Sequence, residues 1–512
     1  MIVPSTARAL VRYALLSFLL SAFAAGQNSE QRTAHYLDSV RKQPQLLLAF
    51  LRDMPKGGDL HNHLDGAVYA KDLIDFAASG GLCVDRTSSE LLAPPCDASC
   101  ENYNAKPAVQ CAYGNQTLYN RMIDAWSMRN WTPGEESGHD HFFAAFSKFG
   151  LASHTHVAEA IAAATNRAGM DHLQYVEYMH TADGGAAAQL AGKVTWNPDF
   201  AKMRDALLSA GIKEVATETS KRLADDDARA REIMKCGTPD AAPGCDMTVR
   251  YLYQVLRGLP QEVVFAQILL GFELASADPK FVGLNLVMPE DWYVPIHDFN
   301  HHMAMIDYLH GLYPKVHITL HAGELAMGLV PPEDLTFHIR ASIERGHAER
   351  IGHGVDVMNE TDPLGLLHEM AARNILVEIC LTSNDLILGV SGDDHPLPIY
   401  MKYGVPVALA TDDEGVSRSD LTHEYLRAVE TYKLSYADLK RMARQSLEHS
   451  FLPGESLWTD TKLVFRMRLA CMRDAPGAEK PSPSCEQFLA ASERASMQWK
   501  LEAEFAKFEK KY

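Results

Sequence analysis

Two histidines, His61 and His63, stand two positions apart at the end of a short apolar segment near the start of the chain. Side chains alternate along a β-strand, so residues i and i+2 point the same way and both imidazole rings can reach one metal ion. Such a pair alone is weak evidence, because the chain has 22 histidines, several of them closely spaced. Its significance depends on the polar segments that follow.

Three later segments place polar side chains directly after short apolar runs rich in β-branched residues. They are His321-Ala322-Gly323-Glu324, Gly352-His353-Gly354 and Thr411-Asp412-Asp413. Such runs are typical of buried parallel strands. In a (β/α)8 barrel the C-terminal ends of all strands form one face, so we expect residues hundreds of positions apart to converge on a single site.

Three neutral imidazoles and one carboxylate form a suitable ligand set for Zn²⁺ and leave a position for water. We assign His61, His63, His321 and Asp412 to this set and expect one zinc ion per chain. Zinc lowers the pKa of a bound water to about 7, which makes a nucleophile available at neutral pH. Glu324 is the candidate proton donor, provided that burial keeps its carboxyl group protonated.

A complete barrel is needed to position these residues. Strands are predicted near Gly58 and over Leu173–Tyr178, Val263–Leu270, Phe281–Val287, Val316–Leu320, Arg350–Gly352, Ile375–Cys380 and Pro406–Ala410. Helical patterns between them fit βαβ crossovers, and residues 196–261 would form a long connection between strands two and three. The predicted fold class is therefore α/β, a (β/α)8 TIM barrel of the metal-dependent hydrolase type.

The chain has 512 residues, whereas eight strand–helix units take about 250. We expect a signal peptide at 1–25, an N-terminal helical segment at 26–53, the barrel at 54–450 and a C-terminal helical segment at 451–512. A Cys-, Pro- and Asn-rich stretch at about 80–115 matches no barrel unit. It is predicted to be a disulfide-braced insertion after strand one.

The first 25 residues have the pattern of an export signal. Arg8 and Arg12 precede an apolar run that ends in Ala22-Phe23-Ala24, a small-x-small cleavage site. The run is too short to span a bilayer comfortably. We expect a periplasmic or secreted protein that has no membrane contact once the signal is removed.

Cysteine use agrees with an oxidising compartment. Eight of the nine cysteines fall in loop-like segments in three local groups, which suits disulfides. Proximity predicts the pairs Cys236–Cys245 and Cys471–Cys485. The first four, Cys83, Cys96, Cys100 and Cys111, allow three connectivities, and Cys380, in a strand-like run, is predicted to be a free buried thiol.

The formal net charge of -18 argues against DNA or RNA as a partner, because phosphate contacts come mainly from Lys and Arg. The acidic balance itself names no substrate; a small-molecule partner is expected on the strength of the motifs, not of the charge. A homodimer is one assembly that the sequence allows.

Several segments in this order resemble the adenosine deaminase family. They are Met54–Ala67, His321–Glu324, Arg350-Ile351-Gly352-His353-Gly354, Leu381-Thr382-Ser383-Asn384 and Thr411–Asp413. The signal peptide, the Met54-Pro55-Lys56-Gly57 lead-in and the Cys-containing insertion are more similar to the secreted branch, the adenosine deaminase-related growth factors. The resemblance covers roughly residues 54–450.

The resemblance implies hydrolysis of adenosine, and of 2′-deoxyadenosine, to inosine and ammonia. Attack at purine C6 requires a proton at N1, which Glu324 would supply. By resemblance, His353 orients the attacking water and shares in proton transfer or charge stabilisation, Asp413 hydrogen-bonds the purine N7, and Asp65 reaches the ribose hydroxyls. Either Asp413 is protonated or the ring carries a donor, since an ionised carboxylate only accepts.

One position departs from the family pattern. Met288 occupies the place after strand four where the family commonly has a glycine whose backbone faces the purine, and Pro289 removes a neighbouring donor. This departure bears on purine selectivity more than on catalysis. The end of strand four also carries no lysine suited to carbamylation, which favours one zinc ion over a bridged pair.

Two alternatives stay open. The same barrel could hydrolyse another aminopurine derivative, although AMP is disfavoured because no basic cluster near these motifs offers a phosphate clamp. The protein could also be a secreted binding or signalling protein whose insertion, Gly80–Asn115, engages a surface partner while deamination is incidental. The remaining close histidines, His139, His141, His154 and His156, lie in a helix-like stretch and are predicted to be structural.

Overall fold

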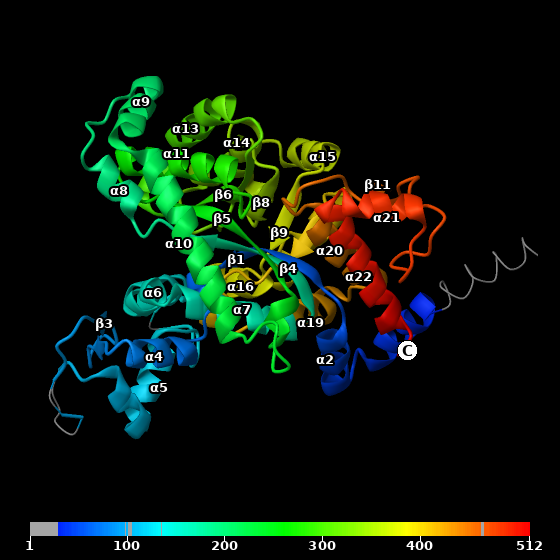
Figure 1. Cartoon of the computed structure of the whole chain (residues 1–512), viewed down its shortest axis with the longest axis horizontal. Helices are drawn as coiled ribbons and strands as arrows, with labels where there is room; N and C mark the ends of the chain where they lie inside the picture. Colours follow the sequence, from blue (N-terminus) through cyan, green and yellow to red (C-terminus); the bar gives the residue numbers. More distant parts are fainter. Residues whose placement is uncertain (1–28, 98, 101–104, 135, 462–464) are drawn as a thin grey trace, which may run out of the picture.

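The computed structural model describes residues 29–97, 99–100, 105–134, 136–461 and 465–512. Eight parallel strands follow one another in the order β1-β4-β5-β6-β7-β8-β9-β10 (Figure 1). Their bounds are β1 Gly57–His63, β4 Leu173–His180, β5 Thr248–Leu256, β6 Phe281–Val287, β7 His317–Ala322, β8 Arg350–His353, β9 Leu376–Ile379 and β10 Val407–Leu409. A parallel bridge between Asn62 and Asp412 joins the last strand to the first. The predicted TIM barrel is confirmed, and its ring closes beside the predicted metal ligands.

One predicted strand is wrong. Residues Val263–Leu270 lie in helix α11 (Gln261–Ala277), and the third strand is β5, within the stretch predicted to be a connection. Helix α11 is buried along its whole middle, from Val264 to Leu274. A helix without a polar face has no 3.6-residue period to distinguish it from a buried strand.

Helices surround the strands and cover the ends of the barrel (Figure 1). The longer ones are α2 Pro44–Asp53, α4 Ala70–Ser79, α5 Gln116–Ala125, α6 Gly138–Thr155, α7 Val157–Met170, α9 Phe200–Ala210, α10 Ile212–Ile233, α13 Phe299–Leu312, α15 Pro363–Arg373, α19 Leu421–Tyr432, α20 Tyr436–Glu448 and α22 Glu493–Glu509. The shorter ones are α3 Leu64–Ala67, α8 Ala186–Ala191, α12 Tyr293–His297, α14 His338–Glu344, α16 Leu381–Leu388, α17 Leu397–Tyr403, α18 Glu414–Ser417 and α21 Pro483–Ala490. No described helix is both long enough and apolar enough to cross a bilayer.

The strands are buried on both faces, as a parallel sheet between a packed interior and an outer helical layer requires. Every residue of β4 and of β6 is buried. Apolar side chains on one side of each strand therefore hold the helices. The other side faces the barrel interior, where polar residues such as Glu177, Thr319 and Glu378 are buried.

The insertion after β1 contains a small hairpin, β2 Cys83–Val84 and β3 Leu91–Leu92, followed by a 3₁₀ turn at Val109–Gly114. Disulfides join Cys83 to Cys96 and Cys100 to Cys111. Such cross-links restrict the unfolded chain and so stabilise a segment with little core of its own.

The two other predicted disulfides are present. Cys236 is bonded to Cys245 and Cys471 to Cys485, and Cys380 is free and buried. The Cys471–Cys485 bond lies in a small apolar cluster beside the hairpin β11 Trp458–Asp460 and β12 Arg466–Met467.

The segments at the two ends of the described chain pack against each other. Residues 29–40 are helical, and with α2 they contact the last helix: the Phe50 and Phe508 rings lie 5.1 Å apart, and Lys511 Nζ lies 2.7 Å from Asp53 Oδ2. Figure 1 shows α2, α20 and α22 side by side. The predicted signal peptide lies outside the described residues.

Candidate active site

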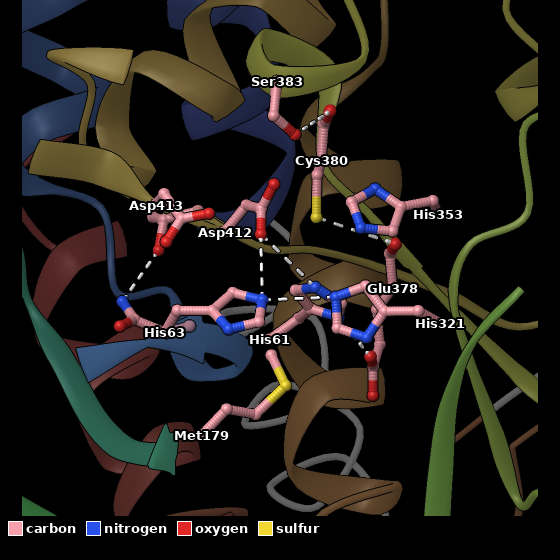
Figure 2. Close-up of polar contacts among 12 residues, drawn as sticks. His61, His63, Met179, His321, His353, Glu378, Cys380, Ser383, Asp412 and Asp413 are labelled. Atoms are coloured by element: carbon pink, nitrogen blue, oxygen red, sulfur yellow. Dashed lines mark hydrogen bonds and ion pairs between the residues drawn. The ribbon is translucent and has the colours of Figure 1, made fainter. Parts of the chain in front are cut away.

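The predicted residues meet at the C-terminal end of the strands. His61 and His63 end β1, His321 lies near the end of β7, and Asp412 follows β10. His63 Nε2 lies 3.2 Å from His321 Nε2, and Asp412 Oδ1 lies 3.5 Å from His61 Nε2 and 3.4 Å from His63 Nε2. Figure 2 shows the three imidazoles gathered beneath Asp412. Residues separated by 351 positions therefore share one pocket, as the strand-end pattern predicts.

Each of these three imidazoles is held by an acceptor at Nδ1. His61 Nδ1 donates to Glu378 Oε2 over 2.7 Å, and His63 Nδ1 to Gln254 Oε1 over 2.9 Å. His321 Nδ1 donates to Asn285 Oδ1, an oxygen that also accepts from the His321 backbone N–H, both over 3.0 Å. A ring that carries its proton on Nδ1 presents the Nε2 lone pair at the opposite edge, so all three rings aim lone pairs at the centre.

This arrangement fits a bound cation. Two bare nitrogens 3.2 Å apart repel one another unless a positive charge lies between them, and His61 Nε2 is buried with no hydrogen-bond partner in the part of the chain that the structure describes. Burial alone would lower the pKa of His61, but the neighbouring Asp412 and Glu378 carboxylates raise it to about 10. The same histidines hold the pKa of buried Asp412 well below its ordinary value. The surroundings thus favour positive charge at the point where a metal ion would be ligated.

A network of buried charges lies behind His61. Glu378 accepts from His61, from Thr319 Oγ1 (3.0 Å) and from Arg350 Nε (2.6 Å), and Arg350 in turn donates to Glu177 over 2.6 Å. The Arg350 guanidinium and the His61 ring keep the pKa of Glu378 below its ordinary value despite its burial. Outer partners of this kind fix the orientation of a ligating histidine and raise its basicity.

Glu324 is buried, as its proposed role requires. It is 7% exposed, and burial, together with the Asp412 and Glu290 carboxylates, raises its pKa well above the ordinary value. Burial therefore favours the protonated carboxyl group, the form that can donate. Its Oε1 lies 3.7 Å from His353 Nε2, on the metal-facing side of the pocket.

The loop that carries Glu324 is clamped by two residues that sequence reasoning missed. Glu290 accepts from the backbone N–H groups of Gly323 (3.2 Å) and Glu324 (2.8 Å). Arg257, at the end of β5, donates to the His321 carbonyl over 3.1 Å and lies 4.0 Å from Glu290 Oε2. Both residues lie just after the end of a strand, which is a signal for functional residues in this fold. The sequence does not indicate, however, that the two lie close to each other.

His353, at the end of β8, differs from the three other histidines. It is fully buried, and burial lowers its pKa to about 3, so the ring is neutral. Its Nδ1 lies 3.0 Å from Asn384 Nδ2, a donor, and its Nε2, on the side of Glu324, has no hydrogen-bond partner among the described residues. His61, His321, His353 and Asp412 offer ligand atoms within 4.8 Å of one another, as do His63, Asp412 and Asp413. His353 differs from His61, His63 and His321 because its Nδ1 faces a hydrogen-bond donor, whereas the Nδ1 of each of the others faces an acceptor.

Asp65, Met288 and Asp413, the predicted substrate-binding residues, all line the same cavity as His63, His321 and Glu324. Burial, reinforced by Asp412, raises the pKa of Asp413 well above its ordinary value, so Asp413 can donate a hydrogen bond. Met288 has φ +89°, a conformation that glycine adopts without steric cost. That backbone geometry explains why a glycine is expected at this place, and the Met288 side chain packs over Gly258.

The cavity has a volume of about 630 Å³ and an aromatic wall supplied by α6. Phe142, Phe143, Phe146 and Phe149 of this helix line it. Both ends of α6 are tied to barrel loops, because His139 Nε2 lies 2.9 Å from Asp291 Oδ1 and His154 Nε2 lies 3.6 Å from Asp65 Oδ2.

Two of the histidines predicted to be structural therefore anchor this wall. His154, moreover, lies in the cavity beside Asp65 rather than in a packed interior. His141 bonds Glu136 and His156 stacks on Phe76, as structural residues do. The period of the helix predicted which side chains share a face, but not what that face covers.

Comparison with known proteins finds similarity to adenosine deaminases over part of the chain. The adenosine deaminase family model matches residues 216–459. An adenosine deaminase of Escherichia coli is 38% identical over 140 residues, which are 27% of this chain and 39% of that protein. An adenosine deaminase of Clostridium perfringens is 34% identical over 139 residues, with the same coverage. The matched part of the chain thus spans about two fifths of the length of these curated relatives.

A solved structure shares the fold. An amidohydrolase of Burkholderia ambifaria with bound zinc superposes with a TM-score of 0.50 at 16% identity, covering 80% of this chain and 88% of that one. The family match contains β5 to β10 with His321, His353 and Asp412, but it begins after β1. The positions of His61 and His63 at the same site come from the structure alone.

Proposed function

We propose that this chain, whose residues 216–459 match the adenosine deaminase family model, belongs to that family and converts adenosine and 2′-deoxyadenosine to inosine products and ammonia. One observation carries the proposal. Three imidazole nitrogens and one carboxylate oxygen converge beside a cavity of about 630 Å³ and a buried glutamate whose pKa is raised well above its ordinary value. That combination supplies both a ligand set for a metal ion and a proton donor for the ring under attack.

His61, His63, His321 and Asp412 would hold one zinc ion. When bound, zinc supplies an activated water as the nucleophile. Three histidines and one carboxylate agree with the preference of zinc for nitrogen ligands and low coordination number. The carboxylate network around Glu378 keeps His61 oriented for this purpose.

The residues around the metal site would transfer the proton and bind the substrate. Glu324 holds the proton that purine N1 needs as C6 is attacked, and releases it there. Asp413 faces N7, and its raised pKa makes it a donor to that nitrogen. Asp65, together with His154, is placed to bind the ribose hydroxyls, while the aromatic wall of α6 excludes water from the ring.

Nucleosides are favoured over nucleotides. Among the described residues that line the cavity, Arg222 alone is a lysine or arginine, and its guanidinium already donates to the Ala182 carbonyl. A phosphate clamp usually draws on several such groups. Because Met288 reshapes the wall where a glycine is expected, another aminopurine derivative is the second candidate substrate.

We place the protein outside the cytoplasm, in the secreted branch of the family. Four disulfides support this proposal, because such bonds persist in oxidising compartments. Two of them brace the insertion after β1.

A substrate panel on the purified protein tests the activity. Adenosine, 2′-deoxyadenosine, AMP and guanosine are followed by absorbance, with and without a chelator, and zinc per chain is measured. We expect the two adenine nucleosides to be consumed, the chelator to stop the reaction and zinc to approach one equivalent. Failure to convert any aminopurine would refute the proposal, and two equivalents of zinc would refute the mononuclear site.

A further inference from the structure

Behind His353 lies a chain of three hydrogen bonds that runs away from the cavity. Leu397 N–H donates to His395 Nδ1 over 3.1 Å. His395 Nε2 lies 3.1 Å from Asn384 Oδ1, and Asn384 Nδ2 lies 3.0 Å from His353 Nδ1. His353 and Asn384 are fully buried and His395 is 1% exposed, so water does not compete for these groups.

The backbone N–H of Leu397, at the outer end of this series, fixes the direction of all three hydrogen bonds. A backbone N–H can only donate, so His395 Nδ1 carries no proton and the proton of this ring sits on Nε2. That Nε2–H donates to Asn384, which turns the amide oxygen towards His395 and the amide nitrogen towards His353. The amide nitrogen donates to His353 Nδ1, and the only ring position left for a proton on His353 is Nε2.

We propose that Asn384 and His395 are positioning residues that hold His353 as the Nε2–H tautomer, so that it offers the pocket an N–H donor and not a lone pair. The inference rests on the proposed function for its catalytic meaning, but not for its structural content. In this role Asn384 and His395 act only through His353.

Two consequences follow for the site. First, His353 cannot serve as a metal ligand while its Nε2 is protonated, although it lies among atoms close enough to be ligands. Its neighbours His61, His63 and His321 have the opposite polarity, with Nδ1 donating to an oxygen. Second, His353 is arranged to hydrogen-bond an oxygen at the reacting carbon and to stabilise charge there, 3.7 Å from Glu324.

Asparagine at two positions provides a matched pair of variants. Asn384→Asp replaces the donating amide with a carboxylate that only accepts, so His353 must move its proton to Nδ1 to bond it. Asn285→Asp makes the same chemical change beside His321, but there the asparagine oxygen already accepts, so the tautomer of His321 is retained. Both asparagines are fully buried, which equalises the cost of burying a carboxylate.

The tautomers are measured by NMR on the zinc-loaded full chain labelled with ¹⁵N in the histidine rings. The His353 signals are identified by their absence in His353→Gln. We expect the proton on Nε2 in the wild type, on Nδ1 in Asn384→Asp, and on Nε2 again in Asn285→Asp. A wild-type proton on Nδ1, or an unchanged tautomer in Asn384→Asp, would overturn the inference.

A second variant covers the case in which Asn384→Asp does not fold. His395→Ala removes the donor that orients the amide, and we expect a mixture of His353 tautomers. His395→Gln retains an N–H donor and should restore much of the Nε2–H form. An unmixed wild-type tautomer in His395→Ala would show that His395 has no positioning role.

Activity supplies the catalytic readout. For Asn384→Asp we expect kcat to fall roughly 10²-fold or more, with KM changed far less. An unchanged kcat together with a moved proton would refute the importance of the tautomer. If the wild type fails to deaminate any aminopurine, the proposed function fails, whereas the NMR result still decides the tautomer.

Discussion

A glutamate in water is ionised at neutral pH and has no proton to give. Glu324 differs because it is buried and faces the Asp412 and Glu290 carboxylates, which together raise its pKa well above the ordinary range. Glu290 also accepts from the Glu324 backbone N–H and so fixes the position of the residue. Glu290 thus contributes both to the raised pKa and to the placement of the acid.

Replacing Glu324 by glutamine tests this role. The amide has nearly the same shape and can still hydrogen-bond, but it cannot transfer a proton. We expect kcat for adenosine to fall on the order of 10²-fold or more, measured by the loss of adenosine absorbance. Zinc content and inosine affinity serve as controls and should stay near wild type. Near-full turnover by Glu324→Gln would show that another group is the acid.

Close contact between strands β1 and β8 is a property of elements rather than of one side chain. A Cβ atom added to Gly352 would lie 2.5 Å from His61 Cε1 and 2.8 Å from His61 Nδ1. His61 cannot retreat without breaking its bond to Glu378. The glycine between Ile351 and His353 therefore makes room for a ligand carried by a different strand.

We expect Gly352→Ala to weaken zinc binding by about 10- to 100-fold, the usual cost of disturbing the outer support of a metal ligand. Zinc affinity is measured by competition with a chromophoric chelator. Gly311→Ala is the matched control, because that glycine lies in α13 and no atom of the described residues lies within 4 Å of an added Cβ, its own helix and chain neighbours aside. There alanine should leave zinc binding unchanged. Equal zinc affinity in both variants would contradict the steric argument.

The strand ends could be predicted because each functional residue follows a run of apolar residues. Strand β5 was missed since Arg250 and Gln254 interrupt its apolar pattern. Gln254 is polar because it points inward to hold His63. Gln254, which supports the site, thus interrupts the apolar pattern by which its own strand would be predicted. Glu290, Glu378 and Asn384 were likewise unassigned, because their roles are defined by partners distant in sequence.

Buried acids couple the stability of the whole molecule to pH. Glu424 is fully buried and accepts from the Thr382 backbone N–H over 3.1 Å and from Ser419 Oγ over 3.2 Å. Burial nevertheless raises its pKa to about 7. At a pH between the pKa of Glu424 in the unfolded chain and its raised pKa in the folded protein, Glu424 is protonated in the native state but ionised in the unfolded chain. The contribution of this protonation to the free energy of unfolding is therefore lost as pH rises towards 7.

Glu424→Gln mimics the protonated acid and has no such loss. Relative to wild type, the variant should gain about 2 kcal/mol more unfolding free energy at pH 7 than at pH 5. Denaturant unfolding curves at the two pH values measure the difference. Glu344→Gln, whose side chain is 48% exposed, is the control and should show no such trend. A variant whose gain does not grow with pH would indicate that Glu424 is ionised in the native protein.

The ring of strands and the metal site depend on the same residues. Strand β1 meets the end of β10 through two backbone bonds, Asp412 N–H to the His61 carbonyl (2.9 Å) and His63 N–H to the Asp412 carbonyl (3.2 Å). The side chains of these three residues are proposed zinc ligands. A bound cation would therefore tie the first and last strands together at the point where the barrel closes.

Removing zinc should accordingly lower the Tm of the whole protein, and adding it back should restore the Tm in step with free zinc. A ligand that binds only the native state stabilises it by about 2.7 kcal/mol at 100 times its Kd. Calorimetry with and without chelator measures the effect. Asp412→Asn should lose the zinc dependence, while Asp393→Asn, at an exposed position, should keep it. Because the unfolded chain brings His61 and Asp412 together only rarely, an unchanged Tm on chelation would mean that these residues do not hold the ion.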